Sequence, residues 1–191
     1  LPLLALLALL VALGVAPARG WGEDVPVEVL SVANGGPWGE WGDPEFCPRG
    51  TYAVGVQLKV EAHRGFFGDD SGLNGVKLFC DSAGTASSSV GPRGSWLPSQ
   101  TCPQRQPLVA FRLRVEPPQG VWDDVAASNL DAMCGDGTVL LGQGTLAGTW
   151  GNWSLSCPTS WRVCGIRTLL EPPQRAGDDT GLNNLQMFCC P

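Results

Sequence analysis

The sequence repeats one arrangement of residues three times, with a period of 55 residues. A Cys-Pro pair begins at Cys47, Cys102 and Cys157, and a glutamate recurs at the same spacing. Each unit also opens with tryptophan and closes with a further cysteine. A fixed period of this length is typical of architectures in which no unit buries its apolar face alone. We therefore predict a single domain over 21–191, built from repeats at about 36–90, 91–145 and 146–191.

The centre of each repeat has the pattern of a β-strand. Apolar residues alternate with smaller or more polar ones, which predicts one buried and one solvated face of an antiparallel sheet. The residues expected to point inward are Tyr52, Val54, Val56, Leu58 and Val60, then Val109, Phe111, Leu113 and Val115, then Ile166, Thr168 and Leu170. Glycine (26) and proline (16) are about twice as common as usual, which excludes a helical bundle. The sequence thus predicts an all-β body of three sheets around one core.

The first 20 residues have the pattern of a secretory signal. An apolar run at 3–15 is followed by small residues, and it is shorter than the roughly 20 residues of a membrane span. We expect residues 1–20 to be removed and the mature protein to be secreted and extracellular. No second run of membrane length follows, so we expect no membrane span.

Eight cysteines agree with an oxidising compartment, where an even number indicates a disulfide framework. The register favours Cys47–Cys80 and Cys102–Cys134, and each closed loop would add about 3–4 kcal/mol to stability. In the third repeat Cys157–Cys189 with Cys164–Cys190 is favoured, although the swapped pairing is open. The spacings do not match a zinc site, so we expect no metal and no cofactor.

Charge and composition exclude several functions. With 12 basic and 18 acidic side chains, the net charge of −6 lacks the footprint of a nucleic-acid-binding protein. The single histidine, His63, argues against histidine-rich metal catalysis.

The ordered motifs resemble one known family. Trp-Gly-x-Trp, Cys-Pro, Leu-(Lys/Arg)-Val-Glu, Asp-Asp-(Ser/Thr)-Gly-Leu-Asn and a terminal Cys-Cys extend from about Trp38 to Cys190. Together they resemble the vitelline membrane outer layer protein family. The resemblance implies a disulfide-stabilised β-prism, with three Greek-key antiparallel sheets around a pseudo-threefold axis. It also implies a secreted protein of the egg coat, with a transferase-type activity on N-acetylglucosamine oligosaccharides. The second repeat departs from the pattern at 123–129.

Acidic residues at the strand ends are the candidate chemical site. Each repeat has a glutamate and then an aspartate pair, and the nine residues are Glu61, Asp69, Asp70, Glu116, Asp123, Asp124, Glu171, Asp178 and Asp179. Glycoside chemistry needs two carboxyl groups about 5–10 Å apart. However, aspartates before Gly, Ser, Thr or Asn commonly close turns. We favour the structural role over glycan contact, and glycan contact over catalysis. A calcium loop is disfavoured, because the twelfth residue from Asp69 is Cys80.

Two further features bear on function. We expect the recurring tryptophans to pack in the core or between sheets, with stacking on glycan rings as the alternative. Asn152-Trp153-Ser154 fits the N-glycosylation rule, which makes Asn152 a candidate modification site. The leading hypothesis is a non-enzymatic structural protein whose partners are matrix or egg-coat proteins and glycans. The alternatives are a glycan-binding module and a weak N-acetylglucosamine-oligosaccharide transferase.

Overall fold

The computed structural model describes residues 21, 25–61, 72–117, 126–172 and 181–191. Within these ranges the chain forms β-structure and one short 3-10 helix, η1 (Pro103–Arg105). Three long hairpins dominate: β4 (Ala53–Val60) with β5 (Leu73–Cys80), β9 (Leu108–Glu116) with β10 (Ala126–Cys134), and β13 (Arg162–Leu170) with β14 (Leu182–Cys190). The short strands are β1 (Glu28–Leu30), β2 (Glu40–Trp41), β3 (Glu45–Phe46), β6 (Thr85–Ala86), β7 (Ser95–Trp96), β8 (Gln100–Thr101), β11 (Val139–Leu140) and β12 (Thr149–Trp150). The expected signal peptide, 1–20, lies outside the described residues.

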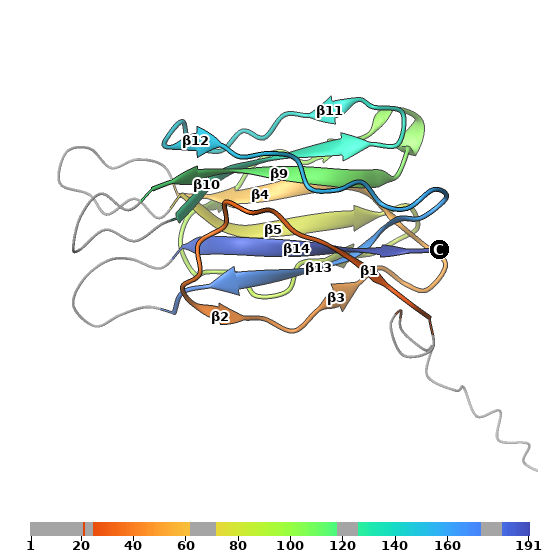
Figure 1. Ribbon diagram of the computed structural model, residues 1–191, viewed down its shortest axis with the longest axis horizontal. Coiled ribbons are helices and arrows are strands. Elements are labelled where there is room, and N and C mark those ends of the chain that lie inside the picture. The colour runs from red at the N-terminus through yellow and green to blue at the C-terminus, as the bar shows by residue number, and fades with distance from the viewer. Residues whose placement is uncertain (1–20, 22–24, 62–71, 118–125, 173–180) are drawn as a thin grey trace, which may run out of the picture.

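Each hairpin is the centre of one antiparallel sheet. The first sheet has the order β6-β5-β4-β7, with β8 also on β4, and the second has β11-β10-β9-β12. The third has β1-β14-β13-β2, with β3 also on β13. Figure 1 shows the hairpins running alongside one another, with the second sheet uppermost and β13 and β14 below. The all-β fold and the three-sheet prism expected from the sequence are confirmed.

The tryptophan segment of each repeat joins the sheet of the preceding repeat. β7, which carries Trp96, pairs with β4, and β12, which carries Trp150, pairs with β9. β2, which carries Trp41 near the start of the chain, pairs with β13 near its end. Every sheet therefore combines residues from two parts of the sequence, and the pairing of β2 with β13 closes the ring of sheets.

One core fills the space between the sheets. Val56 and Leu58 of the first sheet, Phe111 and Leu113 of the second, and Ile166 of the third belong to the same buried cluster. Complete burial of a side chain such as Phe111 contributes about 1.5–3 kcal/mol through the hydrophobic effect. The cluster explains why no single hairpin could bury its apolar face alone.

A β-bulge near the start of each first strand changes the predicted inward face. Val54, Val109 and Cys164 are each passed over in the pairing with the neighbouring strand. A bulge adds one residue to one strand, so alternation is shifted on one side of it. Ala53 and Leu108 therefore contact the core where Val54 and Val109 were predicted to do so. The predicted inward position is wrong for Val109, which is half-buried, whereas Val54 is buried but outside the common cluster. Cys164 lies in a separate cluster with Trp21, Phe188 and Cys190.

Three disulfides link neighbouring sheets. Cys47, whose N–H donates to Cys164 of the third sheet, is bonded to Cys80 of the first. In the same way Cys102 of the first sheet is bonded to Cys134 of the second, and Cys157 of the second to Cys189 of the third. The fourth bond, Cys164–Cys190, joins adjacent strands of the third sheet. The structure therefore contains the favoured pairing of the third repeat and not its swap.

None of the helical structure among the described residues is long and apolar enough to cross a membrane.

Candidate functional site

The three recurring glutamates lie at one end of the prism. Glu116 is the last residue of β9, while Glu61 and Glu171 directly follow β4 and β13. β2 and β12, which pair with the final residues of β13 and β9, mark this end at the left of Figure 1. We call it the glutamate end. The six aspartates of the candidate set, Asp69, Asp70, Asp123, Asp124, Asp178 and Asp179, lie outside the described residues.

Glu61 is buried in the contacts that close the first hairpin. Its side chain is 4% exposed, and its carboxylate lies 3.9 Å from a guanidinium nitrogen of Arg93. Its backbone N–H donates to Gly72 across the hairpin, at 2.9 Å. Arg93 precedes Gly94, where an added Cβ would lie 2.4 Å from the carbonyl oxygen of Val60. Glu61 thus helps to hold the segment before β7 against β4.

Glu171 has a similar position but a different partner. Its carboxylate accepts a hydrogen bond from the amide nitrogen Nδ2 of Asn183, at 3.4 Å. The same amide donates to the carbonyl oxygen of Trp38 at 2.9 Å, and Asn183 is 2% exposed. Asn183 is the bulged residue of its strand, passed over between Leu182 and Asn184. Glu171, Asn183 and Trp38 therefore form one network that fixes the N-terminal segment to the third hairpin.

The second sheet differs at the corresponding place. Glu116 is half-buried and pairs with Ala126 in the ladder. Ser128 occupies the position that Asn183 has in the third hairpin, and its hydroxyl donates to the carbonyl oxygen of Ala147 at 2.6 Å. The three glutamates consequently have three different surroundings. Among the described residues, the contacts of Glu61 and Glu171 hold neighbouring segments of the chain in place.

Four tryptophans lie on the outer faces of the sheets, where each stacks with a cation. Lys77 Nζ lies 4.2 Å from the ring centre of Trp96, and the Arg167 guanidinium lies 4.7 Å from that of Trp41. Arg112 contacts two rings, Trp150 at 4.6 Å and Trp153 at 4.9 Å. The prediction that most tryptophans pack in the core or between sheets is wrong for these four. Cation–π contacts of this kind contribute about 0.5–2 kcal/mol each.

Cross-strand partners hold these cations in position. Arg112 donates twice to Asp131 Oδ2, at 2.9 and 2.8 Å, and Asp131 is 1% exposed. Arg167 donates to Gln186 Oε1 at 2.7 Å, on the equivalent pair of strands. In the first sheet the two positions are exchanged. The cation, Lys77, is on the second strand of the hairpin, β5, and pairs with Gln57 on β4. The sequence analysis missed these residues, although Arg112 and Arg167 are separated by the repeat period.

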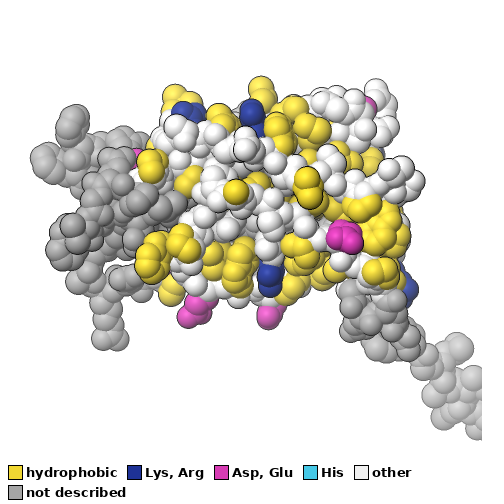
Figure 2. All heavy atoms as spheres, in the orientation of Figure 1, with side chains coloured by type: hydrophobic (Ala, Val, Ile, Leu, Met, Phe, Trp, Pro, Cys, Tyr) yellow, Lys and Arg dark blue, Asp and Glu magenta, His cyan; other side chains and the backbone are white. Residues whose placement is uncertain are grey.

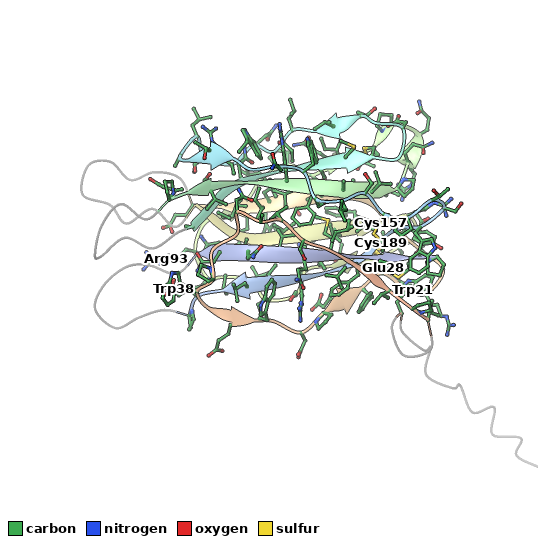
Figure 3. The ribbon with its side chains drawn as sticks, viewed as in Figure 1. Trp21, Glu28, Trp38, Arg93, Cys157 and Cys189 are labelled. Carbon is green, nitrogen blue, oxygen red and sulfur yellow. A yellow bond between two sulfur atoms is a disulfide. The ribbon has the colours of Figure 1, made fainter. Side chains whose placement is uncertain are left out.

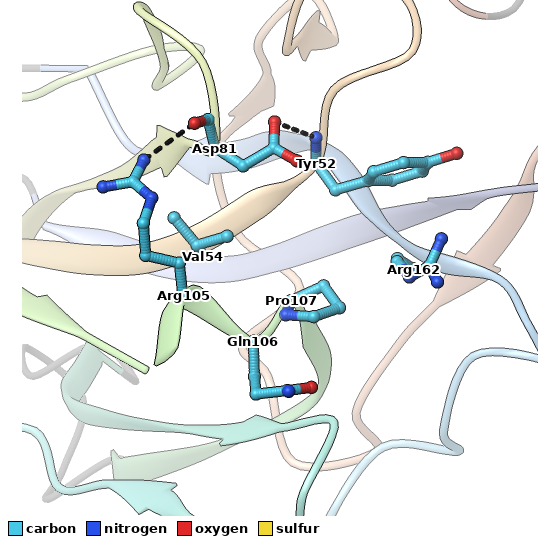
Figure 4. Close-up of a pocket in the computed structure, with 7 residues that line it drawn as sticks. All are labelled: Tyr52, Val54, Asp81, Arg105, Gln106, Pro107 and Arg162. Carbon is cyan, nitrogen blue, oxygen red and sulfur yellow. Dashed lines mark hydrogen bonds between the residues drawn. The ribbon is translucent and has the colours of Figure 1, made fainter. Parts of the chain in front are cut away.

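A shallow pocket of about 350 Å³ lies at the opposite end, where β4, β9 and β13 begin. Its lining residues are Tyr52, Val54, Asp81, Arg105, Gln106, Pro107 and Arg162. Figure 4 shows two hydrogen bonds that occupy its polar walls. Arg105 donates to the carbonyl oxygen of Asp81 at 2.8 Å, and the Tyr52 N–H donates to the Asp81 carboxylate at 3.1 Å. This pocket was not predicted, and its polar groups hold the strand ends together.

The described residues contain no cluster of side chains that could bind a metal ion. All eight cysteines are in disulfides, and no group of three His, Cys, Asp or Glu side chains is assembled there. Hydrogen bonds from the backbone N–H and then the side chain of Thr138 lower the pKa of Asp136. Asp136 lies in an exposed turn after Cys134, away from the glutamate end.

Solved structures share this fold. Frutapin, a lectin from Artocarpus incisa, superposes with a TM-score of 0.54 and 14% identity, covering 87% of this chain and 97% of the lectin. Artocarpin complexed with Me-alpha-mannose gives 0.54 and 12% identity, with 86% and 98% covered. At such low identity the likeness establishes the fold alone, which is the β-prism of these lectins.

Sequence relatives identify the family. The chain is 42% identical to the vitelline membrane outer layer protein 1 homolog of Homo sapiens, over 98% of this chain and 95% of the relative. It is also 42% identical to the homolog of Mus musculus, over 85% and 83% respectively. The family model for vitelline membrane outer layer protein I matches residues 28–191. The chain therefore belongs to the vitelline membrane outer layer protein I family.

Proposed function

We propose that this protein is a secreted, non-enzymatic structural component of an extracellular coat or matrix. The observation that carries the proposal is the ring of three disulfides, each of which joins a different pair of sheets. Such bonds persist in oxidising compartments outside the cell. They make the prism a rigid body suited to packing into a layer.

The surroundings of the glutamates support this role over catalysis. Glycoside chemistry requires one protonated and one ionised carboxyl group that face the same sugar. Glu61 and Glu171 instead contact Arg93, in the segment before β7, and Asn183, in β14. On the face drawn in Figure 2, hydrophobic side chains are spread over the surface among polar ones, as suits contacts with several neighbours in a layer.

Fractionation of cultures that express the full chain tests this proposal. We expect the protein to leave the cell and to sediment with the insoluble extracellular matrix, from which high salt releases little of it. A protein found wholly soluble in the medium would contradict the coat role, and one retained in the cell would contradict export.

A glycan-binding function is the second candidate, because two tryptophans near the glutamate end are open to solvent. Trp38 is 56% exposed and Trp41 39% exposed, and exposed aromatic rings can stack on sugars. Figure 3 places Trp38 at the same end as Arg93. The lectins named above share the fold, which supports testing mannose as well as N-acetylglucosamine oligomers.

Calorimetric titration with both sugars tests this candidate. Trp38→Ala is the test variant, and Leu155→Ala, at an 83% exposed position elsewhere, is the matched control. Binding that Trp38→Ala weakens and Leu155→Ala does not would support the function. If neither sugar gives a binding heat with the wild-type protein, the glycan-binding function is contradicted.

A further inference from the structure

The candidate glycosylation segment, residues 152–154, is docked along β9 of the second sheet. It directly follows β12, which pairs with β9. Asn152 is exposed, so a glycan on its amide would project into solvent. Two backbone hydrogen bonds hold the segment on β9. The N–H of Gly151, just before the segment, donates to the carbonyl oxygen of Leu113 at 2.9 Å, and the N–H of Ser154 donates to that of Phe111 at 2.8 Å. The asparagine is therefore accessible while the backbone around it is fixed.

The hydroxyl group of the motif is buried in this arrangement. Ser154 is 8% exposed, and its Oγ accepts a hydrogen bond from the Phe111 N–H at 3.1 Å. The same Oγ donates to the carbonyl oxygen of Leu155 at 2.8 Å. Both capacities of the hydroxyl are thus used by the fold.

The middle residue strengthens the docking. Trp153 lies under the Arg112 guanidinium, at 4.9 Å, and Arg112 is held by the buried carboxylate of Asp131. Three residues after Ser154, Cys157 is bonded to Cys189 of the third sheet. Releasing the segment would disrupt hydrogen bonds, a cation–π contact and the strand next to a disulfide.

N-glycosylation needs the opposite state of this segment. The transferring enzyme binds the hydroxyl of the third residue and an extended chain around the asparagine. Asn Nδ2 then bonds to the first sugar carbon, the bond from that carbon to lipid pyrophosphate breaks, and the amide loses one proton. The lipid pyrophosphate is the leaving group, and the lipid-linked oligosaccharide is the co-substrate. A hydroxyl held by Phe111 is unavailable for this step.

We propose that Asn152 is an N-glycosylation site that accepts its glycan only before the segment from β12 to Cys157 docks on β9. Occupancy is then set by competition between glycan transfer and folding of the second sheet. The inference rests on the export part of the proposed function, because the reaction takes place in the secretory pathway.

An acceptor assay on the full chain tests the inference without requiring export. Unglycosylated folded protein and the same protein after reduction and alkylation are incubated with oligosaccharyltransferase and a lipid-linked oligosaccharide, and Asn152→Gln is the negative control. We expect the reduced chain to be modified faster by on the order of tenfold or more, because the folded segment must first open. Equal rates would overturn the proposal, as would no transfer to the reduced chain.

Expression in secretory cells gives a second readout. Removing the nearby disulfide with Cys157→Ala and Cys189→Ala should raise the glycosylated fraction of the newly made chain. The matched control is Cys47→Ala with Cys80→Ala, which removes a bond of nearly equal loop length, 33 against 32 residues, that does not involve the second sheet. An equal rise in both variants, or no rise in either, would contradict local competition. Retention of the wild-type chain in the cell would count against export and leave the acceptor assay unaffected.

Discussion

At one end of the prism each pair of neighbouring sheets is joined by a disulfide, whereas the described residues at the glutamate end are held by hydrogen bonds and an ion pair. We call the first the disulfide end, defined by Cys80, Cys134 and Cys189 at the carboxyl ends of β5, β10 and β14. Figure 3 shows Cys157 and Cys189 far from Trp38 and Arg93. The difference indicates that covalent bonds fix one end of the fold, whereas non-covalent contacts hold the described residues of the other.

Removing one inter-sheet disulfide should have the largest effect. Cys157→Ala with Cys189→Ala opens a loop with a sequence separation of 32 residues. We expect a loss of about 3–4 kcal/mol in the free energy of unfolding, because the unfolded chain gains freedom. Chemical denaturation measures it. A loss below about 1 kcal/mol would show that the disulfide end is already held without the bond.

The next largest loss of stability is expected at Gly72, where the backbones of two sheets come close together. Gly72 has φ +63°, and an added Cβ would lie 2.7 Å from the carbonyl oxygen of Ala127 in the second sheet. We expect Gly72→Ala to cost about 1–3 kcal/mol through strain and the clash. Gly50→Ala, at φ +80° with nothing near the added Cβ, is the control for strain alone. Equal losses of stability in the two variants would show that the close contact between the sheets contributes nothing to the effect.

Asn183 tests the network around Glu171. Asn183→Ala removes the hydrogen bonds to Trp38 and Glu171, and we expect a loss of about 1–3 kcal/mol because two part-buried acceptors lose their donor. Asn152→Ala, at an exposed position, is the control and should change stability little. A fluorescence change of Trp38 should accompany the loss. Unaltered fluorescence and stability would contradict the network.

Arg93→Ala should have a smaller effect. Its side chain is 41% exposed and its distance to Glu61 is 3.9 Å, so we expect about 1 kcal/mol or less. The difference between wild type and variant should shrink as salt is added, because the partly exposed guanidinium of Arg93 is screened by ions. A large, salt-independent loss would mean that packing of the arginine, and not its charge, holds this segment.

Asp136, in a turn after Cys134, gives the smallest expected effect. Hydrogen bonds from Thr138 lower its pKa below the ordinary 3.8, since they favour the ionised form. A lowered pKa in the folded state stabilises the protein above the unfolded pKa, and this stability is lost as pH falls through the folded pKa. NMR titration of the carboxyl carbon, with unfolded protein as reference, measures it. An unchanged pKa would contradict the turn's hydrogen bonds.

The sequence predicts much of this fold because its signals are local. Alternation in 52–60 and its copies identifies the first strand of each hairpin, and equal loop lengths indicate the disulfide partners. The bulges at Val54 and Val109 could not be predicted, because apolar residues stand on both sides of each and either face looks equally buried. The pairing of β2 with β13 could not be predicted either, because it joins segments more than 120 residues apart.

The candidate site was predicted less well than the fold. The period identifies Glu61, Glu116 and Glu171. Arg93 carries no motif, and Asn183 ends the Asp-Asp-Thr-Gly-Leu-Asn motif, which does not by itself indicate a contact with Glu171. The recurrence of the tryptophans with the repeat predicts packing in the core or between sheets, which is wrong for the four that stack with cations. A search for cations at the repeat period would have found Arg112 and Arg167, which cover the rings on the outer faces.

Amide hydrogen exchange compares the two ends most directly. The N–H groups of Cys80 and Cys134 donate to Gly84 and Thr138 at the disulfide end, while that of Glu171 donates to Gly181 at the glutamate end. The account predicts slow exchange for the two cysteines, near the rate set by global unfolding, and faster exchange for Glu171 through local opening. Exchange that is equally slow at both ends, or faster at the cysteines, would contradict it.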